Sequence, residues 1–144
     1  MKLLSLSGIC FILLFSPGHA KGQGIDVTIS HLRNTKGFLQ VSVYRNAEEF
    51  DTDSPFLIKK YPKTEIEDGK FSFRLELGSG IYGIAVLDDE NEDGEMEYNC
   101  LGIPKEGFGF SGYYHTGLER PDFSDFNFLL GDGIKRIEIV MKYM

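Results

Sequence analysis

The chain has 144 residues, and 22 acids against 15 bases give it a formal net charge of −7. This excess of negative charge repels nucleic acid and anionic lipid, so we expect neither as a partner. Cationic partners, metal ions and neutral sugars remain open as ligands.

Residues 1–20 have the pattern of a secretory signal peptide. Lys2 precedes an apolar run at 3–15, and Gly18-His19-Ala20 places small residues before a cleavage point. The apolar run is shorter than the roughly 17 residues of a membrane-spanning helix, and no later segment is a candidate. We therefore predict an exported chain whose residues 21–144 form one domain.

The exported part keeps one cysteine, Cys100, so it cannot form an intrachain disulfide. Its stability must come from a packed core, and a domain of this size can bury enough surface for that. We expect Cys100 to be a free thiol that packs in the interior.

Apolar residues alternate along the exported part, as in half-buried strands. About seven strands are expected, at residues 25–29, 39–43, 56–60, 71–77, 81–87, 126–130 and 134–141. Short strands in this number predict an all-β fold, an antiparallel Greek-key β-sandwich.

Three connections have features of their own. Residues 46–50 could form a single helical turn, which Ser54-Pro55 would prevent from continuing. Gly78-Ser79-Gly80 should make a hairpin turn between the strands at 71–77 and 81–87. Together with Gly83 these glycines match a dinucleotide fingerprint, but a strand follows where that fingerprint needs a helix.

Residues 88–97 hold seven acids and no base, and they contain the Asp-x-Asn-x-Asp-Gly spacing of a calcium-binding turn. Calcium takes six to eight oxygen ligands and tolerates irregular geometry, which suits carboxylates on alternate residues. The candidate ligands are Asp88, Asp89, Asn91, Asp93, Glu95 and Glu97.

The match to a helix-loop-helix calcium site is incomplete. Cys100 stands where that loop needs a bidentate glutamate, and no amphipathic helix flanks the segment. Any site would be a weak β-hairpin variant. The alternative is a solvated acidic hairpin in which Asn and Gly only shape the turn. Magnesium and zinc suit these residues less well, and no cofactor is required.

Residues 102–125 are rich in glycine and aromatic residues. Phe108, Phe110, Tyr113 and Tyr114 could form a recognition surface for a sugar or a peptide. The same rings, the phenylalanines above all, could instead close the end of a sandwich. A loop of this length is usually functional or well packed.

Three segments together resemble a known family: Gly80-Ile81-Tyr82-x-Ile84-Ala85-Val86, Asp89-Glu90-Asn91-x-Asp93-Gly94, and the run from Leu101-Gly102-Ile103-Pro104 to Ser111. They are similar to the uncharacterised secreted bacterial proteins called domain of unknown function 2141. The resemblance implies a transthyretin-like or carboxypeptidase regulatory-domain-like sandwich, related in architecture to immunoglobulin domains. It also implies export to the periplasm or cell surface of a Gram-negative bacterium, and it brings no activity or catalytic residue.

The residues leave three functions open. The first is a non-enzymatic module that binds calcium at 88–97 and so presents the segment 101–114 for recognition. The second is a structural or assembly module of the cell envelope without a metal, whose partner is an envelope protein or a glycan. The third is a glycan-directed enzyme. Clustered acids with no basic residue among them are poorly suited to this chemistry. We therefore predict no enzyme activity.

Overall fold

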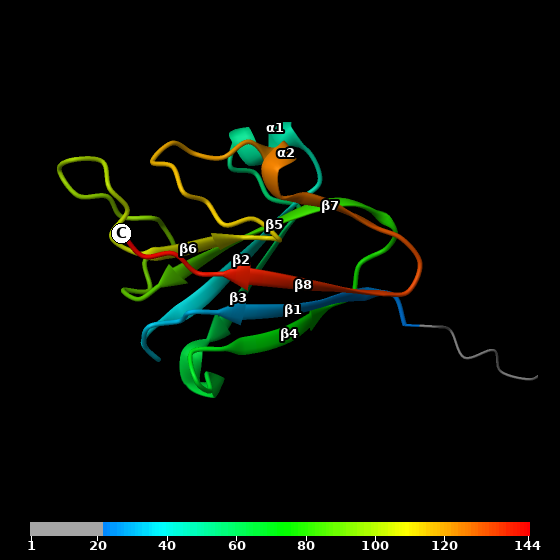
Figure 1. Cartoon of the computed structure of the whole chain (residues 1–144), viewed down its shortest axis with the longest axis horizontal. Helices are drawn as coiled ribbons and strands as arrows, with labels where there is room; N and C mark the ends of the chain where they lie inside the picture. The colour runs from blue at the N-terminus through cyan, green and yellow to red at the C-terminus, as the bar shows by residue number, and fades with distance from the viewer. Residues whose placement is uncertain (1–21) are drawn as a thin grey trace, which may run out of the picture.

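Eight strands in two sheets make up the part of the chain that the computed structural model describes, residues 22–144 (Figure 1). The three-stranded sheet has the order β4 (Phe71–Leu75), β1 (Gly24–Ser30), β8 (Ile134–Val140). The five-stranded sheet runs β3 (Leu57–Pro62), β2 (Phe38–Tyr44), β5 (Gly80–Asp89), β6 (Gly107–Phe110), and β7 (Asn127–Leu130) also pairs with β5. The predicted signal peptide lies outside the described residues.

The predicted all-β sandwich is confirmed, with one strand more than expected and one pair of a different kind. β1 pairs antiparallel with β4 but parallel with β8, in the register Gly24 to Ile134. The first strand therefore lies at the centre of its sheet, between β4 and the last strand of the chain.

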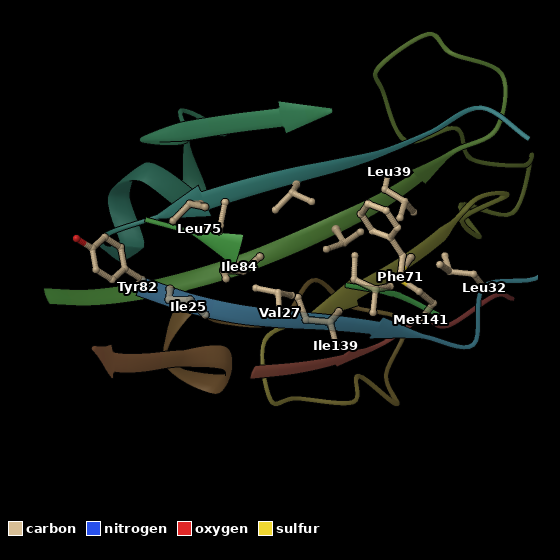
Figure 2. Close-up of a cluster of buried hydrophobic side chains, with 14 of the residues drawn as sticks. Ile25, Val27, Leu32, Leu39, Phe71, Leu75, Tyr82, Ile84, Ile139 and Met141 are labelled. Carbon is tan, nitrogen blue, oxygen red and sulfur yellow. The ribbon is translucent and has the colours of Figure 1, made fainter. Parts of the chain in front are cut away.

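Apolar side chains from both sheets meet between them (Figure 2). The alternation that predicted the strands places every second side chain in this layer. On β1, Ile25, Val27 and Ile29 are buried, and on β2 the same holds for Leu39 and Val41. The core also contains Ile84, Val86, Phe71, Leu75, Leu130, Ile139 and Met141.

A second apolar cluster covers the opposite face of the five-stranded sheet. Two short helices, α1 (Ala47–Asp51) and α2 (Phe123–Phe126), lie side by side there (Figure 1). Their phenylalanines pack on Tyr44 and Phe110 of the strands. Gly83 of β5 makes this approach possible, because a Cβ there would lie 2.6 Å from the ring of Phe126 and 2.7 Å from that of Phe123.

The predicted hairpin at Gly78-Ser79-Gly80 is wrong. β4 belongs to the three-stranded sheet and β5 to the five-stranded one, so this turn carries the chain from one sheet to the other. Alternation identifies a strand, but it does not say which sheet the strand joins.

The segment 102–125 is more regular than its composition predicts, because Gly107–Phe110 forms β6. Its small residues let the strand pass close to its neighbours: a Cβ on Gly107 would lie 2.3 Å from the ring of Tyr143. The short helical turn near 46–50 is present as α1, and the side chain of Asn46 accepts a hydrogen bond from the backbone of Glu49. None of the helices within residues 22–144 has the length and apolar character to cross a membrane.

Candidate metal centre

β5 ends on two neighbouring aspartates, Asp88 and Asp89, and neither carboxylate reaches solvent. Because successive side chains on a strand point to opposite faces, the two carboxylates lie in different surroundings. The acidic loop, residues 90–106, then leads from β5 to β6.

Three carboxylates come together at this end of the five-stranded sheet. Ligand oxygens of Asp89, Asp93 and Glu106 all lie within 4.8 Å of one another. The strand register explains the pairing, since Asp88 of β5 is opposite Gly107 of β6, which places the adjacent residues Asp89 and Glu106 opposite each other as well. We call these three residues the carboxylate cluster.

Half of the buried oxygens in the cluster have hydrogen-bond partners. Oδ2 of Asp89 accepts from the backbone N–H of Gly94 at 2.9 Å, and Nζ of Lys60 is 4.0 Å from the same oxygen. Oε1 of Glu106 accepts from the backbone N–H of Glu90 at 3.2 Å. Oδ1 of Asp89 and Oε2 of Glu106 are buried and have no partner within residues 22–144. Buried carboxylate oxygens without a partner are costly, and a bound cation would supply the interaction that both of them lack.

The environment of the cluster disfavours a third negative charge. Burial raises the pKa of the Glu106 carboxyl, and the nearby charges of Asp89 and Asp93 raise it further, while backbone N–H groups oppose the change. A proton relieves this repulsion, and a bound cation relieves it more completely.

The other predicted ligands shape the loop around Asp93. The amide of Asn91 donates to Oδ2 of Asp93 at 2.9 Å, and the backbone N–H of Glu95 donates to Oδ1 at 2.9 Å. The side chains of Glu95 and Glu97 are exposed, and Glu97 forms an ion pair with Lys105 at 3.6 Å. The structure thus supports the turn predicted for these residues and joins only Asp89 and Asp93 of the predicted set.

Asp88 is a correction to the predicted ligand set. Its Oδ1 is 2.5 Å from Nζ of Lys63, both side chains are 0% exposed, and its Oδ2 accepts from the hydroxyl of Tyr143 at 2.6 Å. Burial, together with the hydrogen bond to Asp88, raises the pKa of Tyr143. Asp88 therefore neutralises a buried lysine on the face of β5 away from the cluster.

Glu106 is absent from the predicted ligand set because it lies far along the chain from the calcium-like spacing. A signal for it was present: it directly precedes the alternating Gly-Phe-Gly-Phe run of β6. Had that run been predicted as the antiparallel partner of β5, the acid before it would have been placed opposite Asp89.

The predicted recognition residues divide into packed and accessible side chains. Phe110 is buried in the second apolar cluster, and Phe108 and Tyr113 are half-buried against it. Tyr114 is exposed. Phe110 therefore has a packing role, but it packs in the second apolar cluster and does not close the end of the sandwich. Phe108 also lines a cleft.

A cleft of about 480 Å³ lies beside the acidic loop, over the outer face of β2 and β5. Phe108 and Phe110 line it, together with Met96 and Tyr98 of the acidic loop and Leu118. Pockets of this volume hold small ligands or single side chains of a partner.

His115 also lines the cleft, and its ring is buried among aromatic side chains. Its Nδ1 is 3.4 Å from the hydroxyl of Tyr113, and its Nε2 is buried without a partner in residues 22–144. Cys100 is exposed, so the expected packing role for it is wrong. No cluster of possible metal ligands within the described residues includes a histidine or Cys100.

Fold and site together define an all-β sandwich with a carboxylate cluster where β5 meets β6. The chain belongs to the bacterial family described as "Uncharacterized protein conserved in bacteria (DUF2141)", which matches residues 27–138. The family resemblance seen in the sequence is thereby confirmed. The chain matches no curated protein and no solved structure.

Proposed function

We propose that this protein is an exported, non-enzymatic module that binds calcium at the carboxylate cluster and thereby fixes the acidic loop. Two observations support the proposal: ligand oxygens of Asp89, Asp93 and Glu106 lie within 4.8 Å of one another, and one oxygen of Asp89 and one of Glu106 are buried without a hydrogen-bond partner in residues 22–144. An ion between them would supply the missing partner for both oxygens.

The ligand chemistry favours calcium over other common metals. All three side chains offer oxygen, and the irregular loop that brings Asp93 to the strand ends suits an ion with flexible coordination. Magnesium demands a nearly ideal octahedron, and zinc prefers imidazole or thiolate, which the cluster lacks. With three carboxylates, further ligands would be backbone carbonyls or water.

Calcium would act on the surroundings through the acidic loop. Asp89 is the last residue of β5 and Glu106 directly precedes β6, whereas Asp93 lies within the acidic loop, whose Met96 and Tyr98 line the cleft. Holding Asp93 on the sheet would therefore order that part of the cleft and the neighbouring segment 101–114. Segment and cleft together make up the proposed recognition surface.

Export is part of the proposal and rests on residues 1–20. The apolar run after Lys2 and the small residues before position 21 support a signal peptide, and the periplasm or cell surface of a Gram-negative bacterium is the proposed location. Extracellular calcium levels can saturate a weak site of this kind, since such modules bind in the range of about 0.1 to 1 mM.

The test is a calcium titration followed by thermal and urea unfolding. With a Kd of about 0.1 mM, calcium at about 10 mM adds about 2.7 kcal/mol to the free energy of unfolding. Asp93→Asn should remove most of this gain, because asparagine keeps an oxygen for the backbone N–H of Glu95 but loses the charge. Glu97→Gln is the matched control, since Glu97 lies in the same loop outside the cluster.

Two results would contradict the proposal. One is an unfolding free energy that does not change with calcium in the wild-type protein. The other is an equal calcium response in the wild type, Asp93→Asn and Glu97→Gln, which would place the bound ion elsewhere.

A second candidate function is an assembly module that docks on another envelope protein without a metal. The observation that favours it is the exposure of two apolar side chains: Leu118, which lines the cleft, is 79% exposed, and Leu101 of the acidic loop is 78% exposed. For a metal-free assembly module, crosslinking in cells should recover the same partner with and without a chelator. For a calcium-binding module, the chelator should abolish recovery of the partner.

A further inference from the structure

Lys63 is the largest side chain within residues 22–144 that is fully removed from solvent, and the calcium proposal gives it no role. It lies at the start of the short 3-10 turn Lys63–Glu65, directly after β3. A buried ammonium group is costly unless its partners compensate it, so its contacts are informative.

The amine of Lys63 lies between a carboxylate and an amide. Nζ is 2.5 Å from Oδ1 of Asp88 and 2.8 Å from Oδ1 of Asn34. Asn34 belongs to the connection between β1 and β2, so three separate segments meet at this one nitrogen. The contact with Asp88 is enough for an ion pair. The contact with Asn34 in addition places the carbonyl carbon of its side-chain amide next to the buried amine.

The other two hydrogen bonds in this group hold the amide and the carboxylate in position. The backbone N–H of Lys36 donates to Oδ1 of Asn34 at 2.9 Å, which polarises the amide carbonyl. The hydroxyl of Tyr143 donates to Oδ2 of Asp88 at 2.6 Å, which leaves Oδ1 directed at Nζ. The result is a nucleophile, a proton carrier and a polarised carbonyl in contact.

We propose that Lys63 and Asn34 become joined by an intramolecular isopeptide bond, with Asp88 as the proton carrier. Asp88 takes a proton from the ammonium group, and the neutral Nζ attacks Cγ of Asn34. The N–H of Lys36 stabilises the negative charge that develops on Oδ1. The bond from Cγ to Nδ2 then breaks.

The step balances without any other reactant. One carbon–nitrogen bond forms and one breaks, and no electron changes hands. Nζ loses two protons: the first passes through Asp88 to Nδ2, which leaves as ammonia, and the second leaves with that ammonia as ammonium. Because Lys63 and Asp88 are both 0% exposed, water has little access to compete with Nζ at the carbonyl.

The bond would serve a chain whose exported part has no disulfide available. It would connect the loop after β1 to the turn after β3, around the β2–β3 hairpin. Because Asp88 is next to Asp89, the isopeptide bond would lie at the same end of the sheet as the carboxylate cluster. The bond does not depend on calcium and would form in its absence.

Tryptic digestion and mass spectrometry of the purified full chain test this directly. In the wild type we expect residues 34–36 to remain attached to residues 61–70, with no cleavage after Lys63 and a joint mass one ammonia below the sum of the two peptides. Lys63→Met and Asp88→Ala should release residues 34–36 as a free peptide. Lys60→Met is the matched control, because Lys60 pairs with Asp89 instead and its loss should keep the link, in a peptide that now begins at residue 60.

The wild-type digest decides the question by itself, so the proposal stays testable where a variant does not fold. Free residues 34–36 together with cleavage after Lys63 would overturn it. A linked peptide that has lost water and joins Lys63 to Asp88 would overturn the role of Asn34. Retention of the link in folded Asp88→Ala would overturn the role of Asp88.

Discussion

Replacing Glu106 by glutamine should have opposite effects on the protein with and without calcium. In a chelator the substitution removes one of three crowded negative charges and leaves an oxygen for the backbone N–H of Glu90. The new amide can also donate to the unpartnered oxygen of Asp89. With calcium present, the same change removes a charged ligand.

The size of the effect follows from the separation of the carboxylates. At 4.8 Å, the upper limit of these separations, and an effective dielectric constant of about 20, two unit charges repel by about 3.5 kcal/mol. Solvent around the exposed Asp93, salt, and the N–H donors from Gly94 and Glu90 reduce this. We therefore expect Glu106→Gln to raise the free energy of unfolding in chelator by on the order of 1 kcal/mol.

Urea unfolding in a chelator and in about 10 mM calcium measures both effects, and the wild-type gain from calcium of about 2.7 kcal/mol should largely disappear in the variant. Glu97→Gln should change neither value by more than a few tenths of a kcal/mol, because its pair with Lys105 is exposed. A Glu106→Gln variant that is less stable than the wild type in chelator and still responds fully to calcium would contradict both expectations.

Three further predictions concern single residues. Lys60→Met should tighten calcium binding about threefold to fivefold, because the ammonium group 4.0 Å from Asp89 competes with the ion and an exposed ion pair contributes up to about 1 kcal/mol. Isothermal titration calorimetry measures the affinity, and an unchanged affinity would contradict the prediction. Burial and the nearby Asp53 raise the pKa of Tyr44 to about 12. The contribution of this tyrosine to stability is therefore complete below about pH 10 and is lost as the pH rises toward 12. Across this range the free energy of unfolding should fall more steeply with pH in the wild type than in Tyr44→Phe. Gly83→Ala should lower the free energy of unfolding by about 1 to 3 kcal/mol, since its Cβ would overlap two phenylalanine rings; an unchanged melting temperature would show that the rings can move aside at no cost.

The strands could be predicted from the sequence because burial on one face imposes alternation. Ile25, Val27 and Ile29 identify β1, and the same reasoning found seven of the eight strands in the described residues. β6 was missed because glycine at its alternate positions removes the side chains on which the pattern depends. The parallel pairing of β1 with β8 is a contact between the two ends of the chain, and no local pattern encodes it.

The candidate site could be predicted only where its residues are close in sequence. The calcium-like spacing contains Asp89 and Asp93, and one local turn brings their carboxylates within 4.8 Å of each other. Glu106 required the register between β5 and β6, which the spacing does not contain. Asp88 was included in error, although the alternation of β5 already assigned it to the face opposite Asp89.

The position of β1 has a consequence for how the molecule folds. β1 needs both β4 and β8 as neighbours, and the register pairs Gly24 of β1 with Ile134 of β8. The three-stranded sheet therefore closes only after β8 has been synthesised, and this pairing spans the largest sequence separation among the strand pairs within residues 22–144. A truncation that removes β8 should leave β1 without a neighbour on one side and the core open there.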